Sequence, residues 1–202
     1  MKYGFSARLF PLMFDKYVYA FLEDNGIRSI SKANIHKEYK KMVQRTPELP
    51  KDNPFLGNIL IGCYVLSFYK ASPELISEEI FHELIIVLCH SKPMVNGHKN
   101  EDAFDKKMLE QKKKDAAASQ TSDQELDWKF TIDVKNNDSY DITYTKCGLC
   151  QLGRREHCFH LIPYLCEADY ITYSLMGAEL RRDHTLAKGD DYCDFQVSRK
   201  KV

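Results

Sequence analysis

The sequence predicts an α+β fold, in which a helical subdomain precedes an antiparallel sheet of about four strands with helices packed on one face. Two observations carry this prediction. Apolar residues of the first half recur at the i, i+3, i+4 spacing of a helix that is buried on one side, and in two segments of the second half they alternate with polar residues, as in half-buried strands. We expect a helical subdomain at 1–98, a charged helix end and flexible linker at 99–127, and a cysteine-rich α+β domain at 128–202.

Four helices are predicted in the first half, over residues 6–24, 32–46, 55–70 and 72–89. Gly26 lies just past the first helix, where glycine commonly ends one. Pro47 ends the second, because the residue before a proline avoids helical backbone. The third is almost entirely apolar and must be buried on several sides. The fourth is expected to begin at Ser72 as its N-cap, with Pro73 at the first helical position.

Residues 99–127 differ in composition from the segments on either side. Lys99 to Asp115 is a run rich in lysines and acids, and three alanines and four polar residues follow it up to Ser122. Charge patterning of this kind is typical of a solvated helix that frays into a linker.

The second half is predicted to be mixed. Phe130, Ile132 and Val134 alternate with polar residues, and a turn at 136–139 precedes a second alternating run from Tyr140, so the two runs form a hairpin. The remaining predicted elements are a short helix, a longer helix and two strands, over residues 148–157, 161–176, 178–186 and 192–197.

Composition excludes several classes of protein. The chain has 202 residues, 44% of them hydrophobic, and its 29 basic and 29 acidic residues balance, which argues against global disorder and against a strongly basic nucleic-acid binder. The most apolar stretch, 54–68, is shorter than the roughly 20 residues that a bilayer-spanning helix needs. We expect no signal peptide and no membrane segment, a cytoplasmic location, and a small-molecule partner, with a homo-oligomer compatible.

Five of the seven cysteines lie between Cys147 and Cys193, and three interpretations of them compete. The first is a zinc site, because the Cys147-x2-Cys150 pair followed by Cys166-x2-Asp169 imitates the spacing of a zinc ribbon. The second is nucleophilic or acid–base catalysis. The third is a core filled by small apolar thiols. We expect no resident cofactor, with zinc as the alternative.

Helix and strand periodicity favour a shared location for three of the chemical groups. Ile162, Cys166 and Asp169 fall on one stripe of the predicted helix, so the acid is expected to be partly desolvated and its pKa raised. Cys193 faces the same side of the last strand as Phe195. If the helix covers that face, two thiols and an acid meet.

The segments that carry these residues resemble the L-2-amino-thiazoline-4-carboxylic acid hydrolase family. The resemblance lies in P-Y-L-C-E-A-D from Pro163 to Asp169 and in T-L-A-K-G-D-D-Y-C-D-F from Thr185 to Phe195, preceded by C-G-L-C at Cys147. It implies an enzyme that opens a thiazoline ring by adding water at the C=N carbon, which gives N-carbamoyl-cysteine. A hydrolase acting on a non-peptide C–N bond is the expected class.

The resemblance supports positions, and the roles assigned to them are hypotheses. We expect catalysis from Cys166 or Cys193 as nucleophile and from Asp169 as proton shuttle. An arginine is expected to bind the substrate carboxylate. The substrate-binding candidates are Cys147, Arg154, Arg182, His184 and Asp194.

A second class of function stays open. The ending with Gly189, Cys193 and Phe195 is also distantly similar to the small-molecule-binding 4-vinyl-reductase-type domain. That likeness implies a non-enzymatic module that senses a small molecule or a metal. Turnover distinguishes the hydrolase from this module, and bound zinc or a hydrophobic ligand would favour the module.

Overall fold

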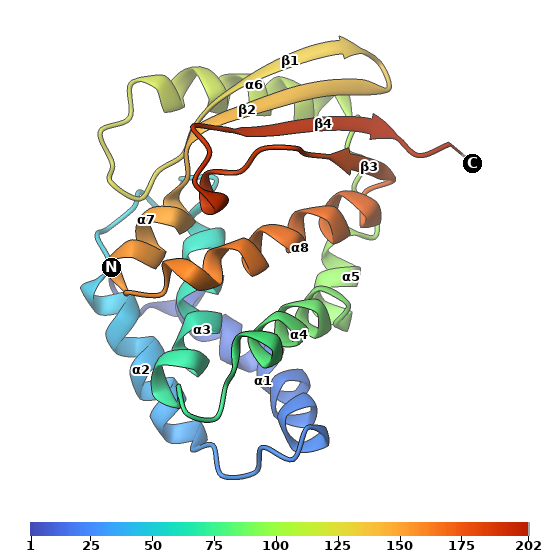
Figure 1. Ribbon diagram of the computed structural model, residues 1–202. Coiled ribbons are helices and arrows are strands. Elements are labelled where there is room, and N and C mark those ends of the chain that lie inside the picture. Colours follow the sequence, from blue (N-terminus) through green and yellow to red (C-terminus); the bar gives the residue numbers. More distant parts are fainter. Residues whose placement is uncertain (202) are drawn as a thin grey trace.

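The computed structural model describes residues 1–201 and has a four-stranded antiparallel sheet covered on one face by helices (Figure 1). The strands are β1 (Lys129–Asn136), β2 (Ser139–Lys146), β3 (Ala178–Arg181) and β4 (Cys193–Arg199), in the order β1-β2-β4-β3. The helices in chain order are α1 (Phe5–Asp24), α2 (Lys32–Arg45), α3 (Leu56–Ala71), α4 (Glu78–Cys89), α5 (Lys92–His98), α6 (Lys106–Gln120), α7 (Gly148–Arg155) and α8 (Ile162–Leu175). The predicted α+β class is therefore confirmed.

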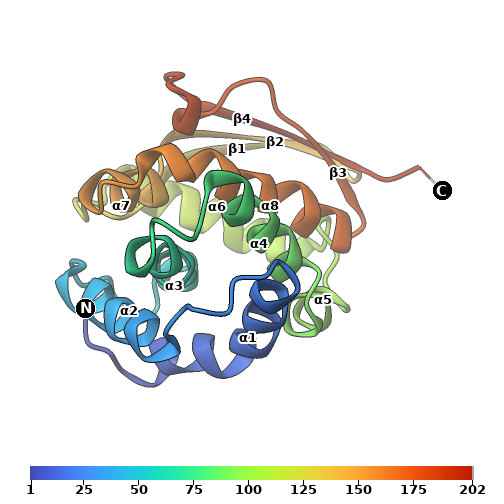
Figure 2. The same ribbon diagram turned by 60° about the horizontal axis from the view of Figure 1, so that its bottom comes forward.

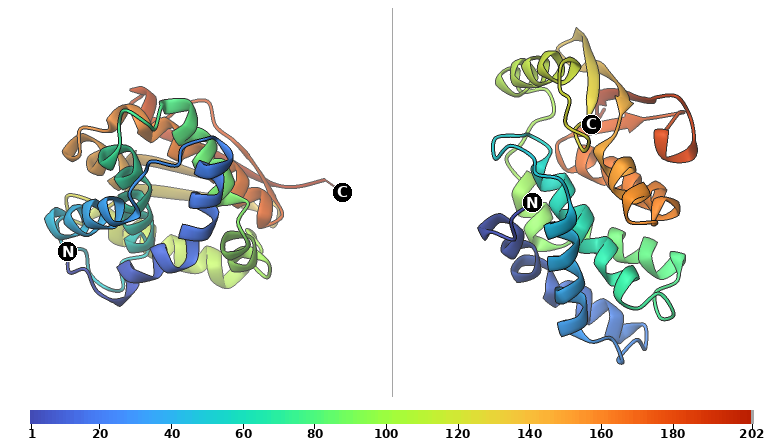
Figure 3. Two further views of the ribbon diagram at one scale, coloured as in Figure 1. Left: turned by 90° about the horizontal axis from the view of Figure 1, so that it is seen from below. Right: turned by 90° about the vertical axis from the view of Figure 1, so that its left-hand side faces the viewer.

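The elements are arranged in three stacked layers, which Figure 2 shows from the side. The sheet forms the first layer, α6 and α8 pack against its strands with α7 beside α8, and α1 to α5 form the layer beyond. The N-terminus lies beside α2 and the C-terminal end extends past β4, on opposite sides of the molecule (Figure 3). No helix within residues 1–201 combines the length and the apolar character that crossing a bilayer requires.

The strand register places one apolar residue opposite another on the covered face. Tyr144 pairs with Cys193 and Ile142 with Phe195 across β2 and β4, and Leu180 of β3 continues the row by pairing with Val197. The alternate residues of β4 face the other way, because successive side chains of a strand point to opposite faces. Buried hydrophobic residues of both halves form one cluster, so the division into subdomains stays a prediction.

Helix α1 passes through Pro11 without ending, and a side chain from α2 explains why. Proline has no N–H to offer the carbonyl four residues earlier, which belongs to Ala7. The hydroxyl of Tyr39 donates to that carbonyl at 2.9 Å instead. The otherwise unpaired backbone oxygen is satisfied, and α1 is fastened to α2 at the same point.

Helix four begins later than predicted. Ser72 forms a single turn, in which its carbonyl accepts from Leu75 and Ile76, and the fully buried Ile76 then draws the chain inward. Ser77 is the actual N-cap, since its hydroxyl accepts from the N–H of Ile80. A serine followed by two glutamates is the stronger helix start, because the acids favour the positive end of the helix dipole.

The segment predicted as a charged helix end and flexible linker contains α6, which continues as a regular helix to Gln120. Asp105 caps the helix, and Leu109 and Ala116 are buried against the rest of the fold. Near its C-terminus the hydroxyl of Ser119 accepts from the N–H of Phe130, and Gln120 donates to the carbonyl of the same residue. The helix therefore docks on the edge strand β1.

The predicted strand 178–186 ends at Arg181. Residues beyond it form a loop with a single 3-10 turn at Leu186–Lys188, which Thr185 caps. Gly189 follows at φ +98°, a left-handed conformation that favours glycine. His184 is therefore not on a strand face, as predicted, but in this loop.

Candidate functional site

Side chains from the sheet and from the layer of α6, α7 and α8 meet between the sheet and α8, and we call this group the candidate site. Strands β2 and β4 contribute Tyr144, Cys193 and Phe195; α8 contributes Cys166, Asp169 and Tyr173; the remaining members are Cys147 before α7, Arg182 after β3 and Lys112 of α6. The ring centres of Tyr144 and Phe195 lie 5.0 Å apart and those of Tyr173 and Phe195 lie 6.1 Å apart. Both pairs pack edge to face, so the three rings form one aromatic cluster.

Arg182 holds the acid of this site in place. Its Nη1 donates to Asp169 Oδ2 at 2.9 Å and its Nη2 donates to the carbonyl of Cys166 at 3.0 Å. The guanidinium lies 5.0 Å from the ring centres of both Tyr170 and Phe195, and the side chain is only 4% exposed. An arginine fixed by two hydrogen bonds and two rings has little freedom to move, so it positions the carboxylate firmly.

Asp169 is both desolvated and reached by solvent. Burial raises its pKa to about 6, against the opposing influence of the Arg182 and Lys112 charges. Its side chain is nevertheless 41% exposed. The carboxyl group is thus partly desolvated and still accessible to solvent, the situation of a group that can exchange a proton with a bound molecule near neutral pH.

The thiols of the candidate site are held in the protonated form. Burial raises the pKa of Cys193 to about 11, although the N–H of Leu186 donates to its sulfur at 3.2 Å. Burial and the nearby Asp169 charge raise the pKa of Cys166 even further. The pKa of Cys147 is raised by its contact with the Cys150 thiol and by burial. Because the thiolate is the nucleophilic form, these shifts disfavour a cysteine nucleophile in the resting protein.

Lys112 also belongs to the candidate site, although the sequence pattern did not indicate it. It lies on α6 within a run of lysines, and its ammonium is 5.9 Å from the ring centre of Tyr173. Burial lowers its pKa, while the charges of Asp169 and Asp115 act in the opposite direction. Within residues 1–201 no ion pair holds this ammonium, whereas its neighbour Lys113 pairs with a glutamate on the surface. A half-buried lysine that forms no direct ion pair within the described residues can attract an anion, in addition to the nearby charges of Asp169 and Asp115.

Three of the predicted substrate-binding residues lie outside this group. Arg154 is exposed and stacks over the ring of Phe159 at 4.2 Å. His184 is exposed in the loop, with its ring against Tyr192. Asp194 lies on the other face of β4, where it accepts from the backbone N–H groups of residues 183 and 184 and so fixes the loop.

The close approach of α7 to the chain before β1 depends on one glycine. A Cβ added at Gly148 would lie 2.1 Å from the carbonyl oxygen of Leu126 and 2.5 Å from the Trp128 ring. A residue without a side chain is therefore required between Cys147 and Leu149. Among the described residues no three His, Cys, Asp or Glu side chains are arranged to hold a metal ion, and the zinc interpretation stays a prediction.

Comparison with known proteins gives one family. The family model described as L-2-amino-thiazoline-4-carboxylic acid hydrolase matches residues 74–197, which is more than half of the chain and includes every member of the candidate site. No curated protein matches the chain.

Some solved structures also align along most of the chain, at low similarity. The Fe(II) unliganded H-NOX protein from K. algicida is 11% identical over 95% of this chain and 96% of its own, with a TM-score of 0.35. The H-NOX protein from S. oneidensis in the Fe(II)NO ligation state is 12% identical over 92% of this chain and 98% of its own, with a TM-score of 0.32. These values are too low to support a conclusion about this chain.

Proposed function

Because the chain belongs to the L-2-amino-thiazoline-4-carboxylic acid hydrolase family, we propose that it hydrolyses a small cyclic amidine that bears a carboxylate. L-2-amino-thiazoline-4-carboxylate is the first candidate substrate. The observation that carries the proposal is the Asp169 carboxylate, which solvent reaches and whose pKa is about 6. A general acid or base is most effective when its pKa lies near the working pH.

The atoms of this reaction define the tasks of the site. To give N-carbamoyl-L-cysteine, the oxygen of water bonds to the ring carbon C2 and the C2–S bond breaks, while both nitrogens stay on C2. One proton of water ends on the ring nitrogen and the other on the departing sulfur. The cleaved bond for this product is therefore C–S, and not the C–N bond of the hydrolase class expected from the sequence.

Asp169 is suited to move these protons. At neutral pH the carboxylate is mostly ionised, so it can take a proton from the attacking water and then pass it to the ring nitrogen or the sulfur. Arg182 keeps the carboxylate oriented through the 2.9 Å hydrogen bond. Water replaces cysteine as the proposed nucleophile, because the pKa of Cys193 is about 11 and that of Cys166 is also raised.

The remaining groups of the site suit the substrate's shape and charge. Tyr144, Tyr173 and Phe195, which pack edge to face, give the inner side of the site an apolar aromatic lining that suits a planar heterocycle. Lys112 offers the positive charge for the substrate carboxylate, the task that the sequence analysis gave to Arg154 or Arg182. Arg182 is already engaged by Asp169 and by a backbone carbonyl, which makes it the weaker choice.

The proposal is tested by incubating the protein with L-2-amino-thiazoline-4-carboxylate and measuring N-carbamoyl-L-cysteine by chromatography. We expect turnover that Asp169→Asn abolishes and that the exposed matched control Asp183→Asn retains. If folded protein forms no product at any pH between about 5 and 9, L-2-amino-thiazoline-4-carboxylate is excluded as the substrate. Saturable binding of the substrate without product would instead favour the non-enzymatic small-molecule-binding module.

A further inference from the structure

A second group of polar side chains lies among α1, α2 and α3, outside the residues that the family model matches. Asp15 of α1 is at its centre, with a side chain only 11% exposed. Its Oδ1 accepts from the hydroxyl of Tyr64 at 2.8 Å, and its Oδ2 meets Lys32 Nζ at 2.8 Å and His36 Nε2 at 2.9 Å. The proposed hydrolase activity makes no use of this group.

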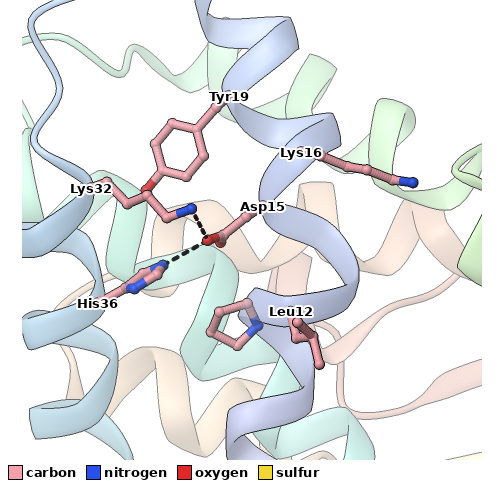
Figure 4. Close-up of a pocket in the computed structure, with 7 residues that line it drawn as sticks. Leu12, Asp15, Lys16, Tyr19, Lys32 and His36 are labelled. Carbon is pink, nitrogen blue, oxygen red and sulfur yellow. Dashed lines mark hydrogen bonds and ion pairs between the residues drawn. The ribbon is translucent and has the colours of Figure 1, made fainter.

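A pocket of about 640 Å³ opens in front of these residues. Figure 4 shows Asp15 and Tyr19 on α1 facing Lys32 and His36 on α2, with the two ion pairs to Asp15 at the base. Besides these four, the pocket is lined by Pro11, Leu12 and Lys16. A polar cluster that only joined α1 to α2 would not require an open pocket beside it, so the pocket suggests a ligand.

Several polar side chains at this pocket have hydrogen-bonding groups that no other described residue uses. The side chain of Lys32 is 58% exposed and uses one N–H on Asp15, so its other N–H groups are free to meet a ligand. His36 is 33% exposed, and within residues 1–201 its Nδ1 has no hydrogen-bond partner; because its Nε2 faces the Asp15 carboxylate, Nδ1 donates to a ligand only when the ring is protonated. The hydroxyl of Tyr19 is buried close by, also without a partner in that range. Unmet hydrogen-bonding groups beside a cavity are typical of binding sites.

The charge and the apolar lining define the ligand class. Lys32 and the protonated form of His36 place two positive charges beside the single carboxylate of Asp15, whereas the Lys16 side chain points away from them, over the Tyr17 ring (Figure 4). Leu12 is 80% exposed at the rim, which leaves apolar surface for a ligand to cover. We propose that this pocket binds a small organic monoanion, a carboxylate attached to an apolar body, with Lys32 and His36 meeting the carboxylate and Leu12 the body.

Calorimetric titration with benzoate tests the proposal, because this probe combines one carboxylate with one apolar ring. Benzamide is the matched neutral probe and inorganic phosphate the matched anion without an apolar body. We expect saturable binding of benzoate that is at least about tenfold tighter than that of either control, since benzamide lacks the charge that Lys32 meets and phosphate lacks the apolar body that Leu12 meets. Equal binding of benzamide, or no saturable binding of benzoate, would overturn the proposal.

Variants locate the bound anion. Lys32→Met and His36→Gln should each weaken benzoate binding about tenfold or more. Lys37→Met, an exposed change on the same helix, should leave it unchanged. Thermal unfolding of each variant verifies that the three helices remain packed, because Asp15 keeps two of its three partners in each case. Undiminished binding in both Lys32→Met and His36→Gln would place the anion elsewhere and overturn the assignment.

Discussion

Replacing Asp169 by asparagine should stabilise the protein at neutral pH while abolishing turnover. The pKa of this carboxyl is about 6 in the folded protein and 3.8 in an unperturbed chain. Between those two values the native state keeps a proton that the unfolded state has lost. The free energy of unfolding therefore falls as pH rises through this window, and the loss is complete above about pH 6. Asparagine imitates the protonated form and can still accept from Arg182.

The size of the effect follows from the two pKa values. They differ by about 2, and each unit corresponds to about 1.4 kcal/mol, which gives about 3 kcal/mol as an upper bound. The Asp169 side chain is 41% exposed, so solvent screening reduces the expected gain to about 1 kcal/mol. A gain of that size in the free energy of unfolding can be measured by urea unfolding.

Urea titrations of wild type and Asp169→Asn over a series from about pH 4.5 to pH 8 measure this gain. The difference in the free energy of unfolding should be largest at pH 8 and shrink toward pH 4.5. Asp183→Asn, an exposed neighbour of Arg182, should show no such pH-dependent gain. The reasoning is refuted if Asp169→Asn is less stable than wild type at pH 8, because the carboxylate would then be a net stabilising charge.

The remaining predictions concern other parts of the molecule. Lys112→Met should lower kcat/KM for L-2-amino-thiazoline-4-carboxylate about tenfold or more but leave 2-amino-2-thiazoline, which has no carboxylate, unaffected; an equal loss on both substrates, or a similar loss in Lys113→Met, would contradict the charge assignment. Gly148→Ala should destabilise the fold by about 1–3 kcal/mol in urea unfolding, because its Cβ would collide with a backbone carbonyl; unchanged stability would count against that close approach. Alkylation of Cys193 by iodoacetamide, followed by mass spectrometry, should be slow at pH 7 and accelerate toward pH 11; fast labelling at pH 7 would restore the thiolate as a candidate nucleophile.

Where local patterns were clear, the sequence was a good guide. Periodicity placed α1, α2, α3 and α8 to within a few residues, and the hairpin of β1 and β2 followed from alternation and turn residues. The sequence did not predict the structure correctly where two local signals competed. Ser72 and Ser77 both begin helix-like motifs, and the burial of Ile76 decided in favour of the second. In α6 the run of charges concealed the small stripe formed by Leu109 and Ala116.

In the candidate site, too, local sequence pattern predicted some relations and the tertiary structure decided the others. The sequence by itself determined that Cys166 and Asp169 share a helix stripe and that Cys193 shares a strand face with Phe195, because both relations depend only on local backbone geometry. The tertiary structure alone decided which charges surround the acid. It brings Arg182 and Lys112 to Asp169, and it leaves Arg154 on the surface. A pKa depends on burial and on charges contributed by distant segments, so no local pattern specifies it.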